Sequence, residues 1–137
     1  MLTALGHGMR CVGIDVDAQP ERVASDVKRI GRAAAVLLGA DDRWSDERVE
    51  VAPGYAGPAY GVPDSSTLEA IGVAARLEAL ALDPVYSGKS MAGVIGLVRA
   101  GRFSKGDVVI WVHTGGAPGA FAYPSAMAKA SSHGAVR

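Results

Sequence analysis

The sequence predicts an α/β fold in which a partial parallel sheet is covered by helices. Short apolar runs of strand length alternate with helical patterns of ten or more residues, and loops rich in glycine and proline separate them. Only two or three strands are expected, whereas both faces and both edges of a parallel sheet need to be covered. The sequence therefore indicates part of a larger α/β domain.

The first third of the chain is expected to hold one strand and one helix. Residues 1–9 resemble the end of a helix, and residues 10–16 form a short, mostly apolar run that predicts a buried parallel strand. Asp17 and Pro20 are typical of a helix start, and the helical spacing continues to about Gly39. One buried stripe is predicted for this helix, formed by Val23, Val27, Ile30, Ala34, Leu37 and Leu38.

A charged surface connection and a second helix are expected next. Residues 41–50 are charged and turn-like, and residues 49–51 can add a short edge strand. Asp64 precedes a helix in which Ser66 and Glu69 have the spacing of a capping box. The apolar stripe predicted for this second helix consists of Leu68, Ile71, Ala75, Leu77 and Leu80.

The last third predicts a helix, a strand and a further helix. The helix covers residues 89–100 and ends at Gly101, and residues 107–112 form the cleanest strand pattern in the chain. A final helix is expected over residues 120–130, followed by a frayed tail over residues 131–137. The residues of the helix over 89–100 that are expected to face inward are Met91, Val94, Ile95 and Val98.

The composition argues against several classes of protein. The 137 residues include 14 Lys and Arg against 14 Asp and Glu, with no basic block, so nothing favours nucleic acid or an anionic membrane. One cysteine, Cys11, cannot form an intrachain disulfide, and three scattered histidines give no zinc pattern, so no metal is expected. Cys11 itself is expected to be buried as a small apolar residue. Without a signal-peptide pattern or an apolar run of membrane length, a cytoplasmic protein is the expectation.

Three polar loops interrupt the hydrophobic elements and are the expected place for a site. They cover residues 56–63, 82–93 and 113–118, and each is punctuated by glycine or proline. In the second loop Gly88 opens a helix whose neighbours are small, so that backbone N–H groups stay accessible to an anion or a heterocycle.

Four motifs in these regions resemble one enzyme family. They are GIDVDAQPERV at 13–23, YAGPAYGVP at 55–63, LDPVYSGKSMAG at 82–93 and HTGGAPGAFAY at 113–123. In this order and spacing they are similar to the C-terminal part of the D-cysteine desulfhydrase and 1-aminocyclopropane-1-carboxylate deaminase family. The resemblance implies pyridoxal 5'-phosphate as cofactor and the tryptophan-synthase-β-like fold (fold type II).

The resemblance also implies that part of the enzyme is absent from this chain. In the family, the lysine that forms a Schiff base with the cofactor and the loop that binds its phosphate precede the GIDVDAQ segment. None of the lysines of this chain matches that position: Lys28, Lys89, Lys105 and Lys129. Residues 1–137 are therefore expected to be the C-terminal part of the large cofactor-binding domain, inactive alone, and the complete enzyme is expected to be a homodimer.

The resemblance assigns roles to individual residues. Tyr60 and Tyr86 match the two active-site tyrosines, for proton handling, substrate contact or ring packing. Ser87 matches the position facing the pyridine nitrogen, Thr114 would lie on the same side, and Gly115 and Gly116 would let the backbone approach the cofactor. From the residues alone, simpler roles are open: a packing lid for the tyrosines and a helix cap for Ser87. For Lys89, solvation on a first helical turn is the simplest expectation, with a charge near an anionic substrate as the alternative, and His113 is expected to be structural.

Two positions bear on the expected reaction. The deaminase branch has Glu where this chain has Ser87, and Leu where it has Thr114. A serine hydroxyl does not hold the pyridine nitrogen as a cation, as a carboxylate would, so the resemblance implies a β-eliminating lyase of the D-cysteine desulfhydrase type. Its small amino-acid substrate would give pyruvate, ammonia and sulfide, or sulfite as in the related L-cysteate sulfo-lyases. The alternatives are 1-aminocyclopropane-1-carboxylate deaminase and a non-catalytic truncated remnant.

Overall fold

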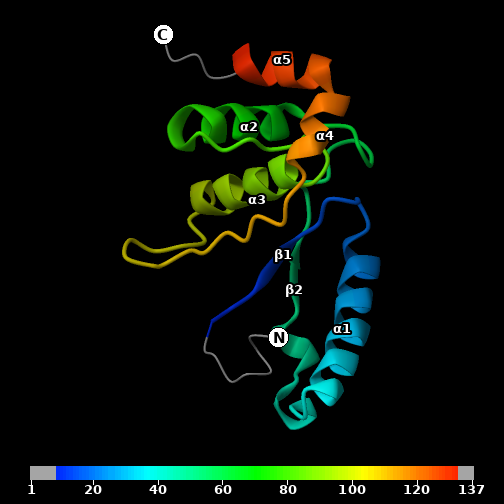
Figure 1. Cartoon of the computed structure of the whole chain (residues 1–137). Helices are drawn as coiled ribbons and strands as arrows, with labels where there is room; N and C mark the ends of the chain where they lie inside the picture. The colour runs from blue at the N-terminus through cyan, green and yellow to red at the C-terminus, as the bar shows by residue number, and fades with distance from the viewer. Residues whose placement is uncertain (1–8, 133–137) are drawn as a thin grey trace.

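The computed structural model describes residues 9–132 and arranges them as a small parallel sheet with helices around it (Figure 1). In chain order the elements are β1 (Val12–Ile14), α1 (Pro20–Leu37), the 3-10 turns η1 (Asp41–Arg43) and η2 (Asp46–Arg48), β2 (Glu50–Ala52), α2 (Ser65–Glu78), α3 (Ser87–Arg99), α4 (Ala117–Ala122) and α5 (Pro124–Ser132). In Figure 1, α2, α3 and α5 form one group, and α1 lies on the other side of the strands. This helix-rich α/β architecture confirms the predicted fold class.

The two strands run parallel and in register. Val12, Gly13 and Ile14 of β1 lie opposite Glu50, Val51 and Ala52 of β2. The ladder continues one step further, because the Asp15 amide donates to the Ala52 carbonyl at 3.0 Å. A parallel strand within residues 10–16 is confirmed, but its predicted burial is wrong, because Val12 and Ile14 are half-buried and Gly13 is exposed. The short strand predicted around 49–51 is its partner. Both strands therefore end at the same edge of the sheet, which is where parallel sheets usually carry their sites.

Helix α1 has the predicted position but not the predicted burial. It begins at Pro20, where the fixed φ of proline suits the first turn, and its N-terminal flanking residue Gln19 makes no side-chain cap. Ala35 is its one buried residue, packed with Ala40 and Trp44. The expected buried stripe is wrong: Val27, Ile30, Leu37 and Leu38 are exposed, whereas Val23 and Ala34 are half-buried. The helix contacts only β2 and η1 to any extent within the described residues, so its outer apolar face is left uncovered.

Helix α2 lies at the centre of the main hydrophobic cluster. Leu68, Ile71 and Ala74 pack there with Leu82 and Ala130. The predicted burial of the other members of the stripe is wrong, because all three are exposed: Ala75, Leu77 and Leu80.

The N-terminus of α2 is capped by Asp64 rather than by the expected capping box. Its carboxylate accepts hydrogen bonds from the Thr67 amide at 2.8 Å, the Thr67 hydroxyl at 2.7 Å and the Ser66 hydroxyl at 2.8 Å. Glu69, the expected partner of Ser66, instead forms a bidentate ion pair with Arg99 at 2.7 and 2.9 Å, which ties α2 to α3.

Helix α3 packs through its small residues. A Cβ on Gly93 would come within 2.7 Å of Ile14, and one on Gly96 within 2.6 Å of the Tyr55 hydroxyl, so β1 and the start of the 55–63 loop lie directly against the helix. Of the large residues expected to face inward, Met91, Val94 and Ile95 are half-buried and Val98 is 55% exposed. Gly101 follows the last turn with φ +70°, which confirms the predicted end of the helix.

Two further expectations for the C-terminal third are wrong. Residues 107–112 form no strand and pair with none in the described part of the chain, and Val108, Ile110 and Val112 are 69–87% exposed. An apolar run of this kind forms a strand only where a neighbouring strand offers its backbone groups. The single helix predicted over 120–130 is two helices, because Pro124 has no N–H and begins a new helix, α5.

Three smaller observations complete the comparison with the expectations. The helix end expected over residues 1–9 and the tail expected over 131–137 lie largely outside the described residues. Cys11 is exposed rather than buried. Between residues 9 and 132 no helix is long and apolar enough to cross a membrane, and no group of three or more His, Cys, Asp or Glu side chains is placed to hold a metal ion.

Candidate functional site

The junction that leads into α3 is organised by one buried carboxylate, that of Asp83. Its oxygens accept hydrogen bonds from the amides of Val85 at 2.8 Å and of Tyr86 and Ser87 at 2.9 Å. They also accept one from the Ser87 hydroxyl at 2.5 Å, while the Asp83 amide donates to that same hydroxyl oxygen at 2.9 Å. The Asp83-Pro84 turn is thus closed by its own side chain, as Asp often does in turns.

These hydrogen bonds set the charge of Asp83. Burial alone would raise the pKa of this carboxyl, but the hydrogen bonds from the Ser87 hydroxyl and from the Ser87, Tyr86 and Val85 amides outweigh it and lower the pKa below 3.8. Asp83 is therefore ionised at neutral pH. The single proton of the Ser87 hydroxyl is donated to it, so Ser87 in this arrangement has a lone pair, and not a proton, left for a ligand.

The two tyrosines singled out by the sequence lie together. The hydroxyls of Tyr60 and Tyr86 are hydrogen-bonded to each other, and their rings meet edge to face with centroids 5.9 Å apart. Tyr60 is 56% and Tyr86 48% exposed, so the pair is open to solvent. The hydrogen bond to Tyr86 raises the pKa of Tyr60 above its usual value of 10, with a further contribution from burial. The Tyr60 phenol is thus protonated at neutral pH.

The Gly115-Gly116 loop reaches the same junction. Both glycines have left-handed φ angles, +104° and +103°. A Cβ on Gly116 would lie 3.0 Å from Asp83 Cγ and closer still to Oδ1, so this loop packs directly on the carboxylate that holds Ser87. Thr114 is exposed, and the described residues show no hydrogen bond between it and Ser87. His113 is also exposed, and its Nδ1 accepts the Gly115 amide at 3.0 Å, which supports a structural role for this histidine.

Lys89 was expected to be solvated, and this expectation is wrong. It is 0% exposed and is the largest fully buried side chain among the described residues. Its ammonium group donates to the carbonyls of Ala56 and Ala59, the latter at 3.1 Å. Burial lowers the pKa of Lys89 below 10.5, opposed by the charges of Asp64 and Asp15. A first-turn lysine gives no sequence signal of burial, because its neighbours in the chain do not reveal the loop that covers it.

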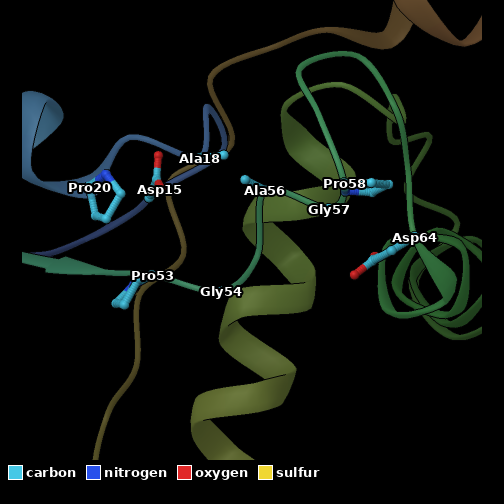
Figure 2. A pocket seen from close by; sticks show the side chains of 9 residues that line it. All are labelled: Asp15, Ala18, Pro20, Pro53, Gly54, Ala56, Gly57, Pro58 and Asp64. Carbon is cyan, nitrogen blue, oxygen red and sulfur yellow. The ribbon is translucent and has the colours of Figure 1, made fainter.

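A pocket of about 390 Å³ opens where the two strands end (Figure 2). The segments that follow β1 and β2 form one side, and the loop held by Lys89 together with the start of α2 forms the other. Its lining residues are Asp15, Ala18, Pro20, Pro53, Gly54, Ala56, Gly57, Pro58 and Asp64. A second hollow of about 430 Å³ lies between Val62 and α5. None of the six sequence-predicted site residues lines either of these two hollows.

The structure therefore brings together most, but not all, of the predicted site. Tyr60 meets Tyr86, and Gly116 meets the Asp83 that holds Ser87, whereas Thr114 stays on the exposed side of its loop. Two residues that organise these contacts, Asp83 and Lys89, were not predicted. The Asp-Pro dipeptide before a helix was a signal for Asp83, since Asp in such turns accepts hydrogen bonds from the amides that follow.

The parallel strands, the small-residue helix α3 and the polar junction before it define part of an α/β domain, a class that usually carries its sites at the ends of the strands. Comparison with known proteins specifies the class further. Residues 2–115 match the family described as "Pyridoxal-phosphate dependent enzyme". The chain belongs to this family of pyridoxal-phosphate-dependent enzymes.

Individual relatives agree with this assignment. The chain is 46% identical over 118 residues to "1-aminocyclopropane-1-carboxylate deaminase" of Burkholderia vietnamiensis, and 44% identical over 123 residues to the protein of that name from Burkholderia multivorans. These matches cover 86% and 90% of this chain but only 35% and 36% of the relatives, so the chain spans about a third of their length. The relatives and the family match confirm the predicted resemblance to the D-cysteine desulfhydrase and 1-aminocyclopropane-1-carboxylate deaminase family, and the family match confirms pyridoxal phosphate as the family's cofactor.

Proposed function

We propose that this chain forms the C-terminal part of the large domain of a pyridoxal-phosphate-dependent amino-acid lyase. The lysine that forms the Schiff base with the cofactor and the loop that binds the cofactor phosphate are proposed to lie in polypeptide outside these 137 residues. The observation that carries the proposal is the meeting of three separate loops at one junction: Tyr60 contacts Tyr86, the Tyr86 amide donates to Asp83, and Gly116 packs against Asp83. The complete enzyme is proposed to be a homodimer.

The residues at this junction are proposed to face the pyridine end of the cofactor. The Ser87 proton is donated to Asp83, so the Ser87 oxygen can accept from a protonated ring nitrogen, and the hydroxyl would have to turn from Asp83 to donate to a neutral one. Ser87 supplies a hydroxyl oxygen, and Gly116, which has no side chain, allows the backbone to lie close to the junction. Together with Thr114 and Gly115 they are the groups proposed to hold the ring. When bound, pyridoxal phosphate withdraws electrons from the α-carbon of an amino acid, so that bonds around that carbon can break.

Tyr60 and Tyr86 are proposed to handle a proton beside the substrate. Because the pKa of Tyr60 is raised, its hydroxyl holds its proton at neutral pH and is suited to donate it rather than to remove one from a substrate. The hydrogen bond between the two hydroxyls lets a proton lost by one be replaced from the other. Both side chains are half-exposed, so the pair can be reached by a small substrate.

Two activities are candidates within this class. The relatives are named 1-aminocyclopropane-1-carboxylate deaminase, and they support this activity better than the desulfhydrase activity that the sequence favoured. D-cysteine desulfhydrase is the second candidate, because Ser87 and Thr114 stand where the deaminase branch is expected to have Glu and Leu. Both reactions release ammonia and a 2-oxo acid, and only the second releases sulfide.

A chimeric protein separates the two activities. The segment of the Burkholderia vietnamiensis deaminase that matches this chain is replaced by this chain. The release of ammonia is measured with 1-aminocyclopropane-1-carboxylate and with D-cysteine, and the release of sulfide is measured with D-cysteine. Ser87→Glu combined with Thr114→Leu is expected to shift the ratio of the two activities toward the cyclopropane substrate by at least about tenfold, since each tenfold change corresponds to only about 1.4 kcal/mol in the barrier.

The starting ratio assigns the activity. Ammonia from the cyclopropane substrate supports the deaminase, and sulfide from D-cysteine without turnover of the cyclopropane substrate supports the desulfhydrase. A folded chimera that releases ammonia from neither substrate would overturn the proposed lyase function and favour a non-catalytic remnant.

The proposed origin of the covalent lysine has its own test. Purified chain incubated with pyridoxal phosphate and reduced with borohydride is expected to show no stoichiometric, single-site increase in mass. None of the lysines of this chain matches the family's Schiff-base position, and Lys89 is in addition buried on two carbonyls. The chimera treated in the same way is expected to gain one label. A single labelled lysine in the unmodified chain would show that the chain contains the reactive lysine after all.

A further inference from the structure

The buried ammonium group of Lys89 holds the loop that carries Tyr60. Its two carbonyl partners, Ala56 and Ala59, lie in the loop that leads from β2 to α2, thirty or more residues before Lys89 in the sequence. Ala56 is 4% exposed, so little water can replace the ammonium at that carbonyl. A buried charge is tolerated only where it is paired or hydrogen-bonded, so these two contacts fix the position of the loop.

The second carbonyl belongs to the turn that presents Tyr60. The Val62 amide donates to the Ala59 carbonyl at 3.1 Å, and Gly61 takes the left-handed φ of +72° that the third position of such a turn requires. Lys89 donates to the same Ala59 carbonyl. The lysine therefore binds the base of the turn directly, one residue away from Tyr60.

The helix end that carries Lys89 also carries the partner of Tyr60. Tyr86 immediately precedes α3, and Lys89 is the third residue of that helix. The start of α3 thus contacts the loop at two points, through the lysine at the base of the turn and through the hydroxyl of Tyr86 at the end of the Tyr60 side chain. Moving the base of the turn would change the distance between the two hydroxyls.

The surroundings of Lys89 are built for a cation. The carboxylates of Asp64, Asp15 and Asp17 all favour its charged form, and burial opposes it. Asp64 is itself fixed as the cap of α2, and the Asp15 carboxylate accepts the Asp17 amide at 3.0 Å. These acids have their own hydrogen bonds, which leaves the carbonyls of the loop as the direct partners of the ammonium group.

We propose that Lys89 is a positioning residue that fastens the Ala56–Ala59 segment to α3 and so sets the contact between Tyr60 and Tyr86. The role in catalysis rests on the proposed lyase function, whereas the positioning itself is a property of this chain and is testable without cofactor. Lys89 does not need to touch the substrate to act in this way.

The test replaces Lys89 by methionine in the full chain, which keeps the length of the side chain and removes its donors. Two signals are expected to change. Hydrogen exchange at the Val62 amide becomes at least about tenfold faster, because a hydrogen bond to a charged group has been lost from the turn. The ¹³C resonance of the Tyr60 ring titrates at a lower pH than in the unmodified chain, because its hydrogen bond to Tyr86 is broken.

Control variants separate positioning from general loss of stability. Lys105→Met removes an exposed lysine. Trp44→Leu weakens the small cluster of Ala35, Ala40 and Trp44, which includes none of the residues of the Ala59–Val62 turn. Neither is expected to change the Tyr60 titration. Lys89→Gln, whose amide can still donate to a carbonyl, is expected to restore part of the Val62 protection, and it serves as the decisive variant if Lys89→Met does not fold.

The outcomes are distinct from those of the proposed function. Unchanged Val62 exchange and unchanged Tyr60 titration in folded Lys89→Met, or in folded Lys89→Gln where only that variant folds, would overturn the positioning role, whatever the chimera does. Conversely, a chimera without activity beside a clear change in both signals would overturn the lyase proposal and leave the positioning role standing.

Discussion

Replacing Asp83 by alanine is expected to lower the free energy of unfolding by about 3 kcal/mol or more, because each buried donor left without a partner costs about 1–3 kcal/mol. Three backbone amides and the Ser87 hydroxyl would all lose their hydrogen-bond acceptor. Urea denaturation followed by circular dichroism measures the change. Asp42→Ala, which alters a carboxylate that is 79% exposed, is the control and is expected to have little effect.

The same carboxylate predicts how stability depends on pH. Its pKa is lower in the folded chain than the 3.8 of an unfolded chain, so between these two values the unfolded chain binds more protons. The contribution of Asp83 is therefore complete above pH 3.8 and is lost as the pH falls through the folded value. Asp83→Asn is expected to be less stable at neutral pH but to lose less stability in acid. An equally steep acid transition in this variant would contradict the assignment.

Replacing Gly116 by alanine is expected to cost about 2–4 kcal/mol, since a left-handed φ and an overpacked contact each cost about 1–3 kcal/mol. The new Cβ would lie 3.0 Å from Asp83 Cγ while the backbone stays at φ +103°. Gly115→Ala is a matched control, because Gly115 has nearly the same φ of +104° and nothing within 4 Å of its Cβ position.

The difference between the two alanine variants isolates the contact from the backbone strain. Both unfolding free energies are measured by urea denaturation, and Gly116→Ala is expected to show the larger loss. Equal losses would mean that the Gly115-Gly116 loop does not pack on Asp83 in solution. An extra loss in Gly116→Ala that disappears when the variant is combined with Asp83→Ala would confirm that the new methyl group collides with the Asp83 carboxylate.

The sequence predicted the elements whose signals are local. Asp64 before an apolar helical pattern, Pro20 in a first turn and Gly101 after a last turn all mark helix ends that the structure shows. The sequence did not predict which apolar faces of these elements are buried. Val27 and Ile30 have helical spacing but are 42% and 57% exposed, and residues 107–112 have strand composition but no strand to pair with in the described part of the chain. Burial depends on such partners, and periodicity alone does not supply them.

The candidate site likewise has a part that could be predicted from the sequence and a part that could not. The resemblance singled out Tyr60 and Tyr86, and the structure shows them in contact across 26 residues of sequence, although their catalytic roles stay predictions. Lys89 was misjudged because a long cationic side chain on a first turn is usually solvated. One of its hydrogen-bond partners, the Ala56 carbonyl, lies more than thirty residues earlier in the chain. The residues next to Lys89 in the sequence give no sign of such a pairing.

The exposed apolar segment over residues 107–112 affects how readily copies of this chain aggregate in a cell. Its exposed valines and isoleucine combine high β-propensity with backbone groups that no strand of the described chain engages. Stretches of this composition are templates for aggregation, because a second copy can add edge to edge. Unless other polypeptide covers the segment soon after synthesis, self-association and recognition by chaperones compete with assembly of the enzyme.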